Sequence, residues 1–192
     1  SSEALGEIVE NYDVIAVLEH ERLNVISYPY EWTFSALKYA ALCHLDIQLD
    51  ALENDIALID AVQLRDDFVG NLLPYDEAKL KKILLTRALP DRVGMSPVGG
   101  LISVVEEKDD FGLLVEVSEM GDSEVFIRVP LSPGFFKDVA ISRSQRVDLG
   151  EKVTFEGEGI LALDGDREHK LGNKRSVAAT IRRDGPWVYD VG

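Results

Sequence analysis

Apolar residues in the first half of the chain recur at helical spacing. Five of them follow one another at intervals of four, four, four and three residues: Leu37, Ala41, Leu45, Leu49 and Leu52. Such a stripe is typical of one face of an amphipathic helix, and it predicts a helix of at least four turns within residues 33–54. Thr33 or Ser35 would cap its first turn. Shorter helices are predicted over residues 3–18 and from Asp76 to about Leu89, where Pro90 stops helical structure.

The apolar period changes to two after Pro90. Residues 124–129 and 175–183 alternate between apolar and polar side chains, which is typical of half-buried strands. Asp164-Gly165 and Asp184-Gly185 are hairpin turn signals, because both residue types tolerate positive φ. About eight short strands at this spacing predict an antiparallel sandwich or barrel.

These two patterns predict an α+β protein with a helical N-terminal part followed by an antiparallel β-sandwich or barrel-like domain. We place the boundary near residue 90. The expected domains are a helix-rich N-terminal region over residues 1–90 and a β-rich C-terminal domain over residues 91–192.

Composition and charge narrow the function classes. The chain has 192 residues, 46% of them hydrophobic and 29% charged, as in ordinary globular proteins. A formal net charge of -15 argues against nucleic acid or an anionic membrane as the partner, because phosphates would be repelled. Cys43 is the single cysteine, and neither a signal peptide nor an apolar span is visible, so we expect a cytoplasmic protein.

Motifs of common catalytic centres are absent from the sequence. The three histidines are far apart, and the sequence has no CxxC or HExxH pair, so no metal site is expected. It also has no GxSxG elbow, P-loop or GxGxxG pattern. No complete catalytic site is therefore visible; if the chain is an enzyme, we expect a transferase.

One local cluster of cations stands out in this acidic chain. It runs from Arg167 to Arg183 and follows the Asp164-Gly165 turn. The planar Arg guanidinium can donate two hydrogen bonds to phosphate oxygens, while Asp and Glu carboxylates can accept hydrogen bonds from ligand hydroxyl groups. The candidate ligand-binding residues are therefore Asp164, Gly165, Arg167, Glu168, Arg175 and Arg182. The alternative is a solvated strand face and a charged hairpin tip without a ligand.

Four blocks in the second half resemble a known family. They are Val93–Leu101, Arg146–Val153, Gly157–Glu168 and Arg183–Val191. Their order and amino-acid sequences resemble the C-terminal domain in the NAD kinase-like family of acetoin-catabolism protein X. The resemblance implies a β-rich domain that follows a Rossmann-like nucleotide-binding domain. The GGDG loop that carries the catalytic aspartate in NAD kinases has no counterpart here, which argues against kinase activity of this chain alone.

Residues 17–60 resemble a different group. The segments His20–Trp32 and His44–Leu49 are similar to the N-terminal region of a group of bacterial SAM-dependent methyltransferases. A DxxxYNxQF-like segment should follow Asp60 in that group, and here residues 61–68 do not match it. The glycine-rich SAM loop is also absent.

Together, these features indicate a nucleotide- or dinucleotide-binding protein related to the NAD kinase-like family and inactive alone. NAD, NADP or ATP would be the ligand. The alternatives are a substrate-binding or accessory part of a SAM-dependent methyltransferase or other transferase, and a structural interaction module. The apolar stripe of the predicted helix also suggests a homodimer or a second chain that completes the site.

Overall fold

The computed structural model describes residues 17–19, 22–24, 38–41, 44–50, 53–65, 76–118, 125–132, 134–172, 176–185 and 187–190. They divide into two compact units, residues 43–182 and a smaller one built from residues 1–42 and 183–192. The smaller unit holds two antiparallel pairs, β1 (Val17–Glu19) with β2 (Arg22–Asn24), and β3 (Lys38–Ala41) with β15 (Trp187–Asp190). The larger unit holds the remaining strands and includes residues on both sides of the boundary expected near residue 90.

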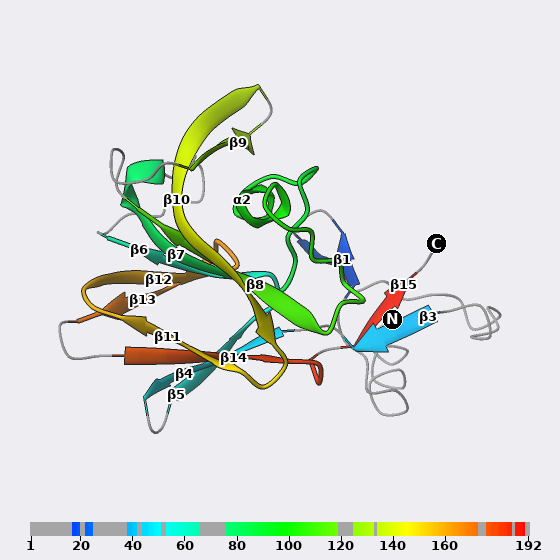
Figure 1. Cartoon of the computed structure of the whole chain (residues 1–192). Helices are drawn as coiled ribbons and strands as arrows, with labels where there is room; N and C mark the ends of the chain where they lie inside the picture. Colours follow the sequence, from blue (N-terminus) through cyan, green and yellow to red (C-terminus); the bar gives the residue numbers. More distant parts are fainter. Residues whose placement is uncertain are drawn as a thin grey trace. The chain divides into compact units, whose positions relative to one another are not determined.

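Two antiparallel sheets make up the larger unit (Figure 1). The four-stranded sheet has the order β11-β14-β4-β5, and its strands are β4 (His44–Asp50), β5 (Glu53–Ala57), β11 (Lys152–Glu156) and β14 (Ser176–Arg182). The seven-stranded sheet has the order β13-β12-β6-β7-β8-β10-β9. Its strands are β6 (Asp60–Leu64), β7 (Leu80–Leu85), β8 (Phe111–Val117), β9 (Phe126–Ser132), β10 (Phe135–Asp148), β12 (Gly159–Leu163) and β13 (Arg167–Leu171).

Each face of the seven-stranded sheet carries its own apolar cluster. One cluster joins it to the four-stranded sheet and includes Leu45, Leu84, Phe155 and Ile181. The other lies on the opposite face, where Val98 of the short helix α2 (Ser96–Gly100) packs against residues such as Ile83 and Val115. Strands β6, β7 and β12 of this sheet therefore bury residues on both faces, whereas β14 alternates, with Val177, Ala179 and Ile181 buried.

The predicted α+β class is wrong, because the described residues form mostly antiparallel β-structure. The helix predicted within residues 33–54 is replaced by β3, β4 and β5. An apolar spacing of four is even, so it fits a strand as well as a helix, and Leu45 and Ile47 lie on the buried face of β4. The homodimer was expected because an amphipathic helix would need a partner surface. Without that helix, the homodimer stays a prediction that its original argument no longer supports.

The helix predicted from Asp76 to about Leu89 is also wrong. Asp76 does cap a helical turn, accepting from the Ala78 N–H at 3.1 Å, but the turn is the short 3-10 helix η2 (Glu77–Lys79). The chain then enters β7, whose apolar residues cover both sheet faces and so lack alternation. The helix predicted over residues 3–18 lies outside the described residues except at its end, where Val17 and Leu18 belong to β1. The β-rich character expected after residue 90 is confirmed.

Candidate functional site

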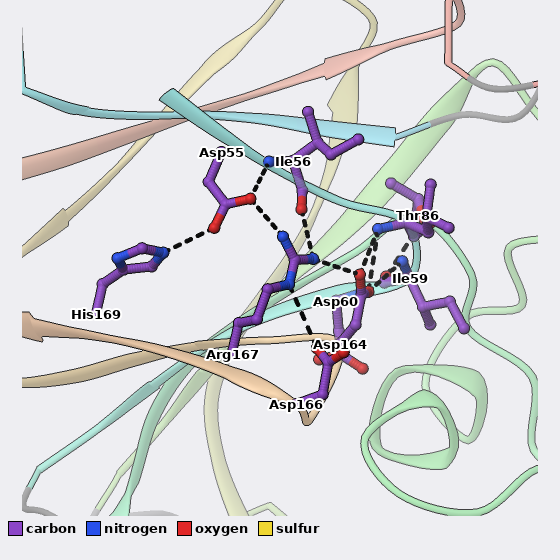
Figure 2. A network of polar contacts seen from close by, with 10 residues as sticks. Asp55, Ile56, Ile59, Asp60, Thr86, Asp164, Asp166, Arg167 and His169 are labelled. Atoms are coloured by element: carbon purple, nitrogen blue, oxygen red, sulfur yellow. Dashed lines mark hydrogen bonds and ion pairs between the residues drawn. The ribbon is translucent and has the colours of Figure 1, made fainter. Parts of the chain in front are cut away.

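The Asp164 carboxylate points inward from the turn between β12 and β13. Asp164 and Gly165 take φ values of 52° and 73°, so the predicted positive-φ turn is confirmed. Asp164 Oδ1 accepts hydrogen bonds from the backbone N–H groups of Leu58, Ile59 and Asp60 at 3.0, 2.8 and 3.2 Å (Figure 2). These residues form the crossover, the point where the chain passes from β5 in one sheet to β6 in the other.

The carbonyl groups of the crossover are satisfied by Thr86. Its Oγ1 donates to the Leu58 oxygen at 2.5 Å, and its backbone N–H donates to the Ile59 oxygen at 2.9 Å. Thr86 is buried, so its hydroxyl and the carbonyl it contacts replace hydrogen bonds that water would otherwise make. The crossover is therefore held from both sides by side chains far from it in sequence.

Arg167 and His169 extend this network to the edge of the other sheet (Figure 2). The Arg167 guanidinium contacts the carboxylates of Asp55, Asp164 and Asp166 and donates to the Ile56 oxygen at 2.7 Å. His169 Nε2 lies 2.8 Å from Asp55 Oδ2. We call Asp55, Asp164, Arg167 and His169 the clasp, because they join β13 of one sheet to β5 of the other.

The clasp changes the ionisation of two carboxyl groups. Burial opposes ionisation of Asp55, but hydrogen bonds from His169 and the Ile56 N–H, with the charge of Arg167, outweigh it and lower the Asp55 pKa. Among the described residues, no such donor reaches the Asp60 carboxyl group. Burial, together with the negative charges of Asp164 and Asp166, raises the Asp60 pKa to about 7.

The candidate residues predicted from sequence lie in several places. Asp164 and Arg167 meet in the clasp, 3.3 Å apart, and Gly165 completes their turn. Glu168 is exposed on β13. Arg182 ends β14 in the other sheet, and Arg175 lies outside the described residues. β12 and β14 are not neighbours, so strand pairing does not bring Arg167 and Arg182 together. Their role as ligand residues stays a prediction.

A second polar region is a cleft of about 300 Å³ that is lined by residues of both sheets. Its cations are Arg65, which follows β6, and Lys81 and Lys82 of β7. Its carboxylates belong to Glu116 of β8 and Glu156 of β11. The remaining lining residues are Gln63, Val117, Ser142 and Thr154. Three cations against two carboxylates make this cleft unusual on a chain of net charge -15.

Two irregular strand positions point side chains into the cleft. Gln63 faces Lys82 while Leu64 faces Leu80, so Lys81 is an extra residue in β7. A regular pleat would point Lys81 and Lys82 to opposite faces, whereas a bulge lets both line the cleft. Ser142 is likewise extra in β10, between the Ile141–Val117 and Arg143–Glu116 pairs.

Lys82 and Gln63 fix the cleft's walls by bonding across the sandwich. Lys82 Nζ donates to the Thr154 oxygen at 3.2 Å and lies 3.4 Å from Glu116 Oε1. Gln63 is buried, and its Nε2 donates to the Glu156 oxygen at 2.8 Å. The Lys81 ammonium lies near Gly157 and makes no ion pair or hydrogen bond among the described residues. Lys81 therefore remains available to a ligand.

The cleft was not predicted from the sequence. Lys81 and Lys82 fall within the helix predicted from Asp76 to about Leu89, and a β-bulge leaves no local sequence signal that would have corrected this prediction. The available signal was the pair of adjacent lysines inside the apolar segment Leu80–Leu85. Lining residues from β6, β7, β8, β10 and β11 come together only through long-range strand pairing.

The described residues contain no group of three His, Cys, Asp or Glu side chains arranged to hold a metal ion. None of their helices has the length and apolar character needed to cross a bilayer.

The fold and the cleft define a two-sheet antiparallel domain with a cleft whose lining carries more cations than carboxylates. Residues 43–184 match the family model described as the C-terminal domain of acetoin catabolism protein X, and this chain belongs to that family. The resemblance predicted from residues 93–191 is thus confirmed at the level of this family.

Two curated proteins are similar to parts of the chain. Acetoin catabolism protein X of Cupriavidus necator is 31% identical over 128 residues, which cover 66% of this chain and 36% of that protein. Nodulation protein NoeA of Rhizobium meliloti is 47% identical over 58 residues, which cover 30% of this chain and 12% of that protein. The matched part therefore spans about a third or less of each relative's length. Kinship to NAD kinases and to methyltransferases stays a prediction.

The clasp predicts a stability effect at Asp164. Asp164→Asn keeps the side-chain size and the tolerance for positive φ, but it can offer only one oxygen where two now accept from the crossover and Arg167. We expect a loss of about 1–3 kcal/mol in the free energy of unfolding, measured by urea denaturation.

The matched control is Asp166→Asn in the same turn, whose side chain is 67% exposed. It should change the unfolding free energy by less than about 0.5 kcal/mol. Equal effects of the two substitutions would contradict the structural role of Asp164.

The raised pKa of Asp60 predicts a pH-dependent effect. The folded chain holds this proton up to about pH 7, whereas the unfolded chain releases it near the ordinary value of 3.8. The contribution of Asp60 to stability is therefore full below 3.8 and is lost as the pH rises to about 7.

Asp60→Asn mimics the protonated group at every pH. Since Asp60 keeps some solvent contact, we expect it to stabilise the protein by about 1–3 kcal/mol at about pH 8 and by much less at about pH 5. Thermal or urea unfolding at both pH values measures the difference. A destabilisation that is the same at both would contradict this account.

Proposed function

We propose that this chain is a nucleotide-binding domain whose cleft at Lys81 binds the ligand's phosphate. The observation that carries the proposal is the cleft's cationic lining on an otherwise acidic chain. The lining carries one more cation than carboxylates, and low-dielectric walls strengthen its field, so this contrast would concentrate an anionic ligand there. NAD, NADP and ATP all carry the required phosphates.

Lys81 supports the proposal most directly. An ammonium group has three donors, and none of those on Lys81 is used within the described residues. Lys82 serves a different purpose, since its contacts with Thr154 and Glu116 hold the cleft in shape. One lysine thus supports the wall while its neighbour is available to a phosphate.

The family gives this proposal a context. One relative's name refers to acetoin catabolism. We infer that this domain contributes ligand binding to a protein of that kind. The match covers about a third of that relative, so we assign this domain ligand binding and no catalytic step.

Charge removal at Lys81 tests the proposal. Lys81→Gln should weaken ADP or NADP binding about 5–20-fold in isothermal titration calorimetry at low salt, because a charge-assisted contact is lost. It should also reduce the dependence of affinity on salt between about 50 and 200 mM.

Lys152→Gln is the matched control. Lys152 lies exposed on β11, a strand that lines the cleft, but is not itself a lining residue. Its substitution should leave affinity and salt dependence nearly unchanged. Absence of nucleotide binding by the parent chain, or equal losses in both variants, would contradict the proposal.

A further inference from the structure

The cleft wall lacks a surface for a nucleobase. Val117 is the one apolar residue among its lining residues, and none of them is aromatic. Bases bound by proteins commonly stack on aromatic side chains, which contributes about 1–3 kcal/mol per base. The cleft volume of about 300 Å³ also lies at the small end of ligand sites, which run from about 300 to 1,000 Å³.

Hydrogen-bond acceptors line the cleft beside its cations. The Ser142 hydroxyl donates a hydrogen bond to the backbone oxygen of Glu116 at 3.0 Å. Its oxygen lone pairs therefore remain available to accept hydrogen bonds from a ligand. The exposed Glu156 side chain makes no hydrogen bond or ion pair among the described residues; only its backbone oxygen is used, by Gln63. Ser142 and Glu156 therefore suit ligand hydroxyl groups, whereas Lys81 suits a phosphate.

We propose that the cleft recognises a sugar phosphate and is indifferent to any base attached to it. Lys81 binds the phosphate, and Ser142 and Glu156 accept hydrogen bonds from sugar hydroxyls. This inference rests on the proposed function, because it takes the phosphate at Lys81 as given. The sugar phosphate is either a free molecule or part of a nucleotide, and the ligand series below distinguishes these sources.

The first experiment compares ligands on the parent chain by calorimetry. Ribose 5-phosphate, AMP and UMP each carry one phosphate and should bind with affinities within about threefold of one another, because the base gains no contact in the cleft. Inorganic phosphate should bind at least about tenfold more weakly, since it lacks the hydroxyls, and adenosine should not bind detectably.

Three ligand outcomes would overturn the inference. They are a preference of more than about tenfold between AMP and UMP, binding of adenosine, and inorganic phosphate binding as tightly as ribose 5-phosphate. The first two would place a base-recognising surface in the site. The third would limit recognition to the phosphate.

Variants then separate sugar recognition from phosphate recognition. Glu156→Gln replaces a charged acceptor by a weaker neutral one, and Ser142→Ala removes the hydroxyl, so each should weaken ribose 5-phosphate about 3–10-fold. Neither should weaken inorganic phosphate, because neither removes a cation. Glu158→Gln is the control, since Glu158 is exposed in the same turn and outside the lining. Lys81→Gln should weaken both ligands.

The two proposals fail differently. If phosphate ligands bind through Lys81 but Glu156→Gln and Ser142→Ala change nothing, the sugar-phosphate inference is wrong and the proposed function stands. If no phosphorylated ligand binds the parent chain, both are wrong. Thermal unfolding of each variant shows whether a loss of binding arises from unfolding instead. If one of Ser142→Ala and Glu156→Gln does not fold, the other variant tests sugar recognition.

Discussion

The inward-turned carboxylate of Asp164 is the contact on which the two-sheet arrangement depends. The chain passes between sheets at Leu58 and Ile59, where backbone groups lose their strand partners and would be left unsatisfied. Asp164 accepts from three backbone N–H groups there, and Thr86 serves the two carbonyls. A shielded carboxylate is costly unless its oxygens are saturated, and here the crossover and Arg167 together saturate them.

Strand β6 runs from the crossover beside the clasp to the cleft. β6 begins at Asp60 beside the clasp and ends at Leu64, with Gln63 and then Arg65 lining the cleft. Polar groups at the two ends differ in how they are used. The Arg167 guanidinium is engaged by three carboxylates, whereas the Lys81 ammonium has no partner among the described residues. This difference, and not the number of cations, favours the cleft as the ligand site.

The amino-acid pattern predicted the second half of the fold better than the first. Alternation in β14 and the Asp164-Gly165 turn were readable because each is local. In β4, spacing at four residues hid the period of two, since Leu45 and Ile47 satisfy a strand equally well. For the site, Asp164 and Arg167 were singled out as polar residues at a turn, but their partners Leu58 and Asp55 lie more than 100 residues away. The cleft depends on two bulges and on non-local strand pairing, neither of which local propensity encodes.

The central claim is that the cleft binds a phosphorylated ligand, whereas the clasp only stabilises the fold. A nuclear magnetic resonance titration with ADP tests this claim most directly. Backbone amide signals of Lys81, Ser142 and Glu156 should shift with ligand, because these residues line the cleft. Signals of Asp55, Arg167 and His169 should stay close to their positions in the unliganded protein. Shifts centred on the Asp164–His169 segment, with the cleft residues unaffected, would contradict the account.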